Sequence, residues 1–341
     1  MVAKEISERA QRVHKEAIVI DMLEALFPAR RPEYFKTAVD VGVTAIQCTI
    51  PHISDDLVGA ITKTADFFKL LETVKDAQFV SAAADIEKAK KEGKLALIAG
   101  MQDAMPYERN LDLLRVFHKL GFRAMQVAYF QQNYLGSGCV EKVDHGLTDR
   151  GREAIKELNR LGILIDTSHC GDKTTIDAAQ ASKDPIAITH TTPGTLVAIP
   201  RARSDEAIKT VAEKGGVIGL VIWVPFCERR GKMGVRPTIS DYVDMIDYVV
   251  NLVGIDHVGL GLDLVPFWKQ EDYDTFGRTH GTTLIHPHKW PTFDKKYVEG
   301  FDGISDTIKI TEELLRHGYS EDDTKKVLGD NWLRLLKQVW K

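Results

Sequence analysis

Short apolar runs recur along the 341-residue chain, and a segment with helical spacing follows each of them. Each run is continuously apolar and does not alternate between apolar and polar residues. Strands show this pattern when helices cover both faces of a parallel sheet. The eight runs span residues 17–22, 43–49, 95–101, 123–129, 163–167, 185–189, 216–223 and 257–262.

The segments between these runs predict amphipathic helices. Apolar residues at helical spacing are clearest in residues 110–120, 150–161 and 240–253. We expect Ser240 to be the N-cap of the third of these helices. We also expect Ser204 to be the N-cap of another helix, which begins at Asp205. A serine at this position accepts a hydrogen bond from a backbone N–H of the first turn.

Strand and helix alternate eight times, which predicts an α/β fold: a closed (β/α)₈ barrel of the TIM type with extra C-terminal helices. An open, doubly wound sheet is the alternative, but no GxGxxG motif follows the first run. Barrels of this length often form one domain, so we expect a single domain over residues 1–341. Residues 3–16 predict an N-terminal helix. The long, aromatic-rich stretch 266–300 predicts a lid-like loop.

Composition narrows the class of protein. Hydrophobic residues make up 44% of the chain and charged residues 28%, and the formal net charge is −4. This balance argues against a nucleic acid or an anionic membrane surface as partner. We found neither a secretory signal nor an apolar run long enough to span a bilayer, so we expect a cytoplasmic protein. The four cysteines include no CxxC pair, which argues against a disulfide framework and against a thiolate zinc site.

Polar residues follow the predicted strands at the end where barrel enzymes place their active sites. His169 and His190 follow two neighbouring strands, and Asp263 follows the last strand. Neutral imidazole is the commonest ligand of transition metals, so the two histidines could share an ion. A carboxylate in the position of Asp263 suits a general base. Each histidine taken alone could equally be structural.

Further candidates lie near other strand ends. Glu24, Gln102 and Tyr129 lie at or just after the ends of the first, third and fourth runs. Arg201, in the loop after the sixth run, could hold a substrate carboxylate, because guanidinium binds carboxylate in a bidentate manner. A solvated surface arginine is the alternative. The His-Pro-His sequence at 286–288 is a weaker metal-binding candidate, because such pairs are common by chance.

Four segments, at residues 162–178, 185–206, 254–263 and 316–335, together resemble the membrane (renal) dipeptidase family of the amidohydrolase superfamily. The likeness keeps the family's order and extends from about Ile18 to Trp340. It implies a βα barrel that typically carries two zinc ions and hydrolyses dipeptides, and a homodimer would be usual. It also implies that His169 and His190 bind one ion and that Asp263 acts as the base. Arg201 falls where the family binds the substrate's C-terminal carboxylate.

This chain departs from the family pattern at the metal ligands. The family's His-x-Asp pair on the first strand is replaced by Leu23 and Ala25, which cannot bind metal. The bridging glutamate is replaced by Gln102, whose amide oxygen is a weaker ligand than a carboxylate. A histidine that contacts the substrate is replaced by Tyr129.

We therefore expect one zinc or other divalent ion, not two, and a site without metal stays open. The expected ligands are His169, His190 and one of Gln102, Glu24 or Asp263.

The predicted function is metal-dependent hydrolysis of an amide or peptide bond in a small carboxylated molecule. The ion would activate water, Asp263 would move the proton, and Arg201 would hold the carboxylate. Tyr129 could donate a hydrogen bond to the developing oxyanion. Two alternatives remain. One is the same barrel acting on a non-peptide substrate as a specialised hydrolase, lyase or isomerase, and the other is a binding protein without catalysis.

Overall fold

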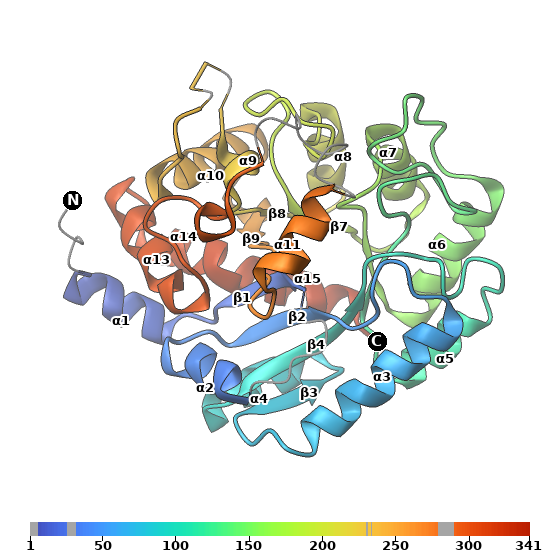
Figure 1. Ribbon diagram of the computed structural model, residues 1–341, viewed down its shortest axis with the longest axis horizontal. Coiled ribbons are helices and arrows are strands. Elements are labelled where there is room, and N and C mark those ends of the chain that lie inside the picture. Colours follow the sequence, from blue (N-terminus) through green and yellow to red (C-terminus); the bar gives the residue numbers. More distant parts are fainter. Residues whose placement is uncertain (1–5, 26–31, 230, 233, 279–289) are drawn as a thin grey trace.

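The computed structural model describes residues 6–25, 32–229, 231–232, 234–278 and 290–341. Within these residues, nine parallel strands form one sheet, with helices arranged around it (Figure 1). The strands are β1 (Ile20–Glu24), β2 (Ala45–Thr49), β3 (Ala77–Val80), β4 (Leu95–Met101), β5 (Ala124–Gln126), β6 (Leu164–Asp166), β7 (Ala187–Thr191), β8 (Val217–Leu220) and β9 (Val258–Leu260).

Eight of these strands close into the predicted (β/α)₈ barrel. The sheet runs in the order β2-β1-β9-β8-β7-β6-β5-β4-β3, and pairing between β2 and β4 closes it. Each of the eight predicted apolar runs contains or overlaps a barrel strand, because a strand that is buried on both faces needs apolar residues throughout. The prediction of a closed barrel is confirmed.

The short strand β3 was not predicted. It pairs with the first half of β4, from Leu95 to Ile98, while β5 pairs with the end of β4 at Gly100 and Met101. Because β2 takes the other edge of β4, the strand β3 lies beside the barrel and is not part of its closed wall.

Helices follow the strands and cover the barrel. They are α1 (Glu8–Glu16), α2 (Pro32–Asp40), α3 (Leu57–Leu71), α4 (Ala83–Glu92), α5 (Leu113–Lys119), α6 (Asp149–Leu161), α7 (Asp172–Ala181), α8 (Asp205–Glu213), α9 (Val224–Cys227), α10 (Ile239–Val253), α11 (Gln270–Phe276), α13 (Thr307–Arg316), α14 (Glu321–Lys325) and α15 (Asn331–Val339). None of the described helices is long and apolar enough to cross a membrane.

The helix caps confirm one prediction and correct another. Ser204 is the N-cap of α8, and its side chain accepts a hydrogen bond from the backbone of Ala207. The N-cap of α10 is Thr238 and not Ser240, which lies inside the helix. Thr238 and Asp241 bond each other's backbone N–H groups, and this reciprocal arrangement starts the helix two residues earlier.

The two predicted terminal and lid segments also differ in detail. Within the described residues, the N-terminal helix begins at Glu8 with Ser7 as its N-cap. Residue 3, where the predicted helix starts, lies outside the described residues. The stretch 266–300 contains the helix α11, so it is not wholly irregular. Its residues 279–289, which include His286 and His288, also lie outside the described residues.

The C-terminal helix α15 covers the end of the barrel at which the strands begin. Its Trp332 is fully buried, and the indole Nε1 donates a hydrogen bond of 3.0 Å to the carbonyl of Leu260. A Cβ atom at Gly259 would lie only 2.2 Å from this Nε1, so the indole needs a glycine at that position. Since the indole fills this end, the polar side chains at the other end form the mouth of the barrel.

Candidate active site

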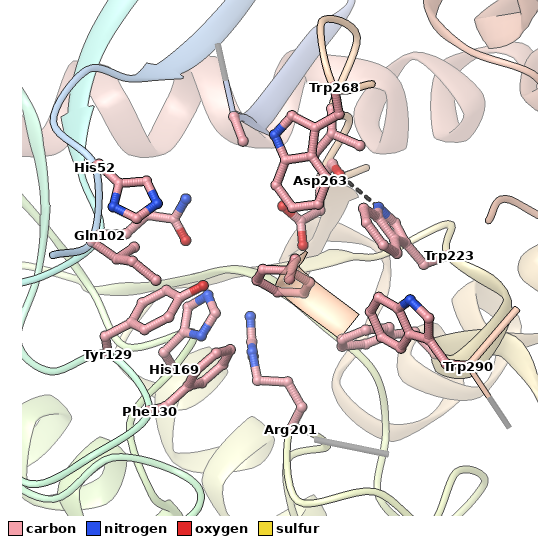
Figure 2. A pocket seen from close by; sticks show the side chains of 15 residues that line it. His52, Gln102, Tyr129, Phe130, His169, Arg201, Trp223, Asp263, Trp268 and Trp290 are labelled. Atoms are coloured by element: carbon pink, nitrogen blue, oxygen red, sulfur yellow. Dashed lines mark hydrogen bonds between the residues drawn. The ribbon is translucent and has the colours of Figure 1, made fainter. Parts of the chain in front are cut away.

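A pocket opens at the carboxyl ends of the strands. Figure 2 shows His52, Gln102, Tyr129, Phe130 and His169 on one side, Trp223 and Trp290 on the other, and Asp263 and Arg201 between them, with Trp268 above Asp263. The lining residues are Ala25, His52, Ile53, Gln102, Tyr129, Phe130, His169, Arg201, Trp223, Phe226, Asp263, Val265, Trp268, Phe276 and Trp290.

The structure brings His169 and His190 together, as their strand ends predict. His169 follows β6 and His190 lies on β7, and these strands are neighbours in the barrel. Their Nε2 atoms are 2.9 Å apart. Burial and the nearby charge of Arg201 lower the pKa of His190 well below its ordinary value, so this imidazole is neutral at physiological pH.

Hydrogen bonds behind His190 determine which of its nitrogens carries the proton. Asp166 accepts bonds from Ser168 and from the backbone and side chain of Thr189. Because the Thr189 hydroxyl donates to Asp166, it accepts from His190 Nδ1, which lies 2.8 Å away. The proton is then on Nδ1, and the Nε2 lone pair faces His169. Because the two Nε2 atoms are at hydrogen-bond distance, this lone pair accepts a bond from the Nε2–H of His169.

Asp263 follows β9 in an unusual backbone conformation. Its φ of 59° is the only positive value among the described residues other than glycine. The indole of Trp223 donates a 2.6 Å bond to the Asp263 carbonyl, and the Asp263 N–H donates a 3.1 Å bond to Leu23. Burial raises the pKa of the Asp263 carboxyl to about 6, although the charge of Arg201 opposes this shift. The carboxyl therefore changes protonation close to neutral pH.

Arg201 is almost completely buried, with 1% of its surface exposed, so it is not a solvated surface arginine. Its guanidinium donates to the backbone carbonyls of Ser168 and His190. These two bonds use two of the five N–H donors of an arginine side chain. The same guanidinium lines the pocket and brings a positive charge to it.

Tyr129 and Gln102 lie on the polar side of the pocket. The Tyr129 ring stacks on His169 with their centroids 3.9 Å apart, and burial raises its pKa well above the ordinary value. The phenol is thus neutral at physiological pH. Gln102 donates a 2.9 Å bond from its Nε2 to Thr49, which orients its amide.

Glu24 is placed apart from these residues. It is fully buried, it accepts a 2.6 Å bond from the Tyr34 hydroxyl, and it is not among the described residues that line the pocket. Burial and the neighbouring Asp21 raise the pKa of Glu24 well above its ordinary value. Ala25, in contrast, lines the pocket with a methyl group.

Sequence reasoning missed His52 and the three tryptophans of the pocket. His52 comes three residues after β2, so the strand-end rule could have found it. Trp223 ends the predicted apolar run 216–223, so the same rule could have found it, whereas only the aromatic content of residues 266–300 pointed towards Trp268 and Trp290.

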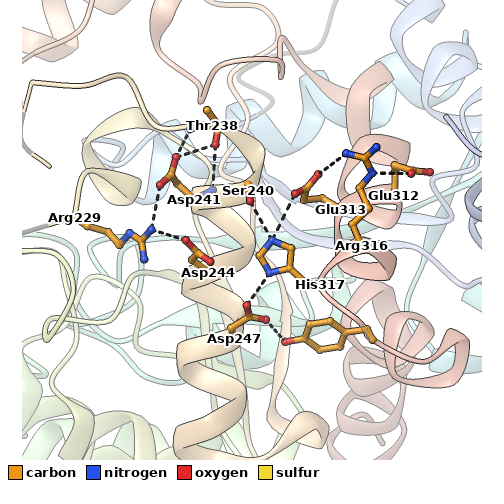
Figure 3. A network of polar contacts seen from close by, with 11 residues as sticks. Arg229, Thr238, Ser240, Asp241, Asp244, Asp247, Glu312, Glu313, Arg316 and His317 are labelled. Carbon is orange, nitrogen blue, oxygen red and sulfur yellow. Dashed lines mark hydrogen bonds and ion pairs between the residues drawn. The ribbon is translucent and has the colours of Figure 1, made fainter. Parts of the chain in front are cut away.

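A separate group with metal-ligand chemistry lies between α10 and α13. Among the described residues, only Asp244, Asp247 and His317 form a group of three or more histidine, cysteine or acidic side chains with ligand atoms within 4.8 Å of one another. Figure 3 shows that the side chains of this group already have hydrogen-bond or ion-pair partners. Arg229 donates to Asp244, and Asp247 bonds both His317 and Tyr319.

Comparison with known proteins identifies relatives over most of the chain. The family model described as membrane dipeptidase (peptidase family M19) matches residues 7–272. Dipeptidase tcpJ of Claviceps purpurea is 26% identical over 274 residues, which cover 80% of this chain and 57% of that protein. An uncharacterized protein in the pqqA 5′ region of Klebsiella pneumoniae is 28% identical, over 76% of this chain and 88% of that protein.

Solved structures share the fold over nearly the whole chain. An amidohydrolase from Pseudomonas aeruginosa is 34% identical, with a TM-score of 0.86, over 97% of this chain and 99% of that one. A metallo peptidase from Rhodobacter sphaeroides, liganded with a phosphinate mimic of the dipeptide L-Ala-D-Ala, is 20% identical. Its TM-score is 0.78 over 95% of this chain and 100% of that one, a likeness that shows the fold.

Proposed function

The chain belongs to the membrane dipeptidase family, peptidase family M19, and from this premise we propose that it hydrolyses an amide bond in a small carboxylated molecule with the help of one divalent metal ion. One observation carries the proposal. His169, the carboxyl of Asp263 and the guanidinium of Arg201 line a single pocket at the mouth of the barrel, and His190 contacts His169 beside it.

The imidazole pair is the proposed ligand pair for one ion. His190 is neutral, and its Nε2 lies 2.9 Å from that of His169, which is a hydrogen-bond distance. A separation of the two rings by about 0.4 Å would let both Nε2 atoms bind one zinc ion at about 2.0–2.1 Å. Gln102 lines the same pocket and is the candidate for a third ligand, since Asp263 does not form a close ligand group with the pair. A second ion has no support at Leu23 and Ala25, which offer only hydrocarbon. A divalent ion bound to the pair would supply Lewis-acid activation of water and of the substrate carbonyl.

The remaining chemistry follows from the side chains themselves. Asp263, with a pKa of about 6, is ionised at neutral pH and can accept a proton from the attacking water. The neutral phenol of Tyr129 can donate a hydrogen bond to the oxygen on which negative charge develops. Arg201 holds the substrate carboxylate, and its bonds to Ser168 and His190 keep the guanidinium in a fixed position.

A hydrolysis screen tests this proposal. Dipeptides and N-acetyl amino acids would be incubated with zinc-supplemented protein, and the released amino groups would be measured. We expect turnover of at least one such amide, and a loss of about 100-fold or more in Asp263→Asn. Asp256→Asn, which changes an exposed carboxylate at the other end of the barrel, is the matched control and should retain full activity. Absence of turnover for every amide would contradict the proposal.

Chemistry without a metal ion is a second candidate. Within the described residues, no third histidine, cysteine or acidic side chain completes a close ligand group with His169 and His190. Turnover that continues unchanged after complete chelation of divalent ions would favour this candidate over the metal-assisted reaction.

A further inference from the structure

Four aromatic side chains close into a ring on one side of the pocket. Trp223 contacts Trp268, Trp268 contacts Phe276, Phe276 contacts Trp290, and Trp290 contacts Trp223 again. The corresponding centroid distances are 6.2, 5.1, 5.8 and 6.1 Å. All four side chains line the pocket, and we call them the aromatic box.

We propose that the aromatic box is the specificity subsite of this enzyme and that it binds an aromatic ring carried by the carboxylated amide substrate. This inference rests on the proposed function for the reacting bond and extends it to the substrate class. It assigns the box to the substituent of the substrate, and not to the bond that is cleaved.

The two-sided arrangement of the pocket supports this assignment. In Figure 2 the side chains of His52, Gln102, Tyr129 and His169, together with Phe130, lie opposite Trp223 and Trp290, and Trp268 lies above Asp263. Phe130 packs against Phe276 and Trp290 of the box. Asp263 and Arg201 stand between the two sides. A substrate whose carboxylate reaches Arg201 and whose amide faces the imidazole pair therefore has its side chain directed towards the box.

Contacts outside the pocket support the aromatic box, and a hydrogen bond connects the box to the backbone of Asp263, the proposed base. Tyr273 packs on both Trp223 and Trp290, with centroid distances of 6.0 and 5.2 Å, and its hydroxyl donates to the carbonyl of Pro291. Trp223 bonds the backbone of Asp263 through its indole nitrogen. A preformed wall of this kind loses little conformational freedom when a ligand binds.

Ring chemistry and charge favour an aromatic substituent over an aliphatic or cationic one. Tilted and edge-on aromatic contacts add to the free energy of simple apolar burial. A cation would also attract aromatic faces, but Arg201 places a buried positive charge in the same pocket. Among the described residues that line the pocket, Asp263 is the only carboxylate, and it is already offset by that guanidinium.

Binding measurements with three probes test the assignment without requiring turnover. The probes are N-acetyl-tryptophan, N-acetyl-alanine and N-acetyl-trimethyllysine, which share the amide and the carboxylate and differ only in the side chain. Titration calorimetry on the full-length Asp263→Asn protein, in which hydrolysis of the probes should be about 100-fold slower or more, should show N-acetyl-tryptophan binding about tenfold or more tighter than N-acetyl-alanine. Equal affinities, no binding of either, or tightest binding of the trimethylammonium probe would each overturn the assignment.

Two variants test whether the aromatic box causes the tighter binding of the tryptophan probe. Phe276→Ala should bring the affinities for the tryptophan and alanine probes within about threefold of each other. Phe68→Ala removes a partly buried ring of α3 that packs on Phe79, outside the pocket, and should keep the full preference. If Phe276→Ala also keeps the full difference in affinity between the two probes, the aromatic box is not the subsite.

The two proposals fail in different ways. If the ring preference is present but no carboxylated amide is hydrolysed, the proposed function fails and the subsite stands. If amides are hydrolysed without regard to the side chain, the subsite fails and the hydrolase remains.

Discussion

His169 and His190 face each other across neighbouring strand ends, with their Nε2 atoms 2.9 Å apart. The arrangement depends on Asp166 at the end of β6, which orients Thr189 and through it His190. The pair therefore has a defined proton arrangement before any ligand binds. This relationship is the basis of the metal-assisted hydrolysis proposed above.

Arg201→Lys should weaken substrate binding more than it slows the chemical step. Lysine keeps the positive charge but cannot bond the carbonyls of Ser168 and His190 while it also holds a carboxylate with two parallel bonds. We expect KM for a carboxylated amide to rise about 10- to 100-fold, with a smaller change in kcat. Steady-state kinetics against an esterified or amidated substrate provide the control, since Arg201→Lys should affect such a substrate much less.

The activity should rise with pH through the pKa of Asp263. The carboxyl is protonated below about pH 6 and cannot accept a proton, so kcat/KM should increase up to that pH and then level off. Because the charge of Arg201 lowers this pKa, Arg201→Met should move the inflection to higher pH. A profile that is flat from pH 5 to 8, or an inflection unmoved by Arg201→Met, would show that Asp263 is not the group that titrates.

Asp21 should make the folded protein less stable as the pH rises. Burial raises the pKa of its carboxyl to about 7 from an ordinary value of 3.8, so the native state binds more protons than the unfolded chain between these values. The free energy of unfolding therefore falls from about pH 4 to pH 7. Asp21→Asn can still accept bonds from Leu262 and Leu23 and removes this penalty.

Urea unfolding in the presence of a chelator checks this effect. At pH 7.5 the variant Asp21→Asn should exceed wild type in stability by on the order of 1 kcal/mol or more, and at pH 4 the two should nearly agree. If the difference between the two proteins is the same at both pH values, the buried carboxyl is not responsible.

Trp332→Ala should be among the most destabilising single changes in the chain. The indole fills the closed end of the barrel and bonds the carbonyl of Leu260, so its removal leaves a cavity and an unpaired acceptor. We expect a loss of about 3–5 kcal/mol in urea unfolding. Trp332→Phe keeps most of the packing and should lose markedly less. A loss below about 1 kcal/mol for the alanine variant would mean that this end does not depend on the indole.

Sequence patterns predicted the barrel well because its strands are apolar throughout and its helices are amphipathic. They missed β3 because its four residues, AQFV, include the polar Gln78 and so form no continuous apolar run. Gln78 and Phe79 are only half-buried in the structure. The predicted cap at Ser240 was wrong because Thr238 and Asp241 form a reciprocal cap that takes precedence.

The candidate site was predictable only where a residue follows directly from a strand end. His169, His190 and Asp263 meet this condition, and the structure places them at or beside one pocket. Glu24 does not line that pocket, because the pairing of β1 with β2 shifts register between Asp21 and Glu24 and the simple alternation of faces no longer applies. The aromatic box joins Trp223 to three residues of the stretch 266–300, and the folded chain brings these two parts together.

Metal analysis of protein purified without added metal tests the central claim most directly. Wild type and His317→Ala should each contain about one divalent ion per chain, and His169→Ala should contain close to none. Loss of the ion in His317→Ala and not in His169→Ala would move the metal to the group with Asp244 and Asp247. That result, or a metal-free wild type that retains full activity, would contradict metal-assisted hydrolysis at the imidazole pair.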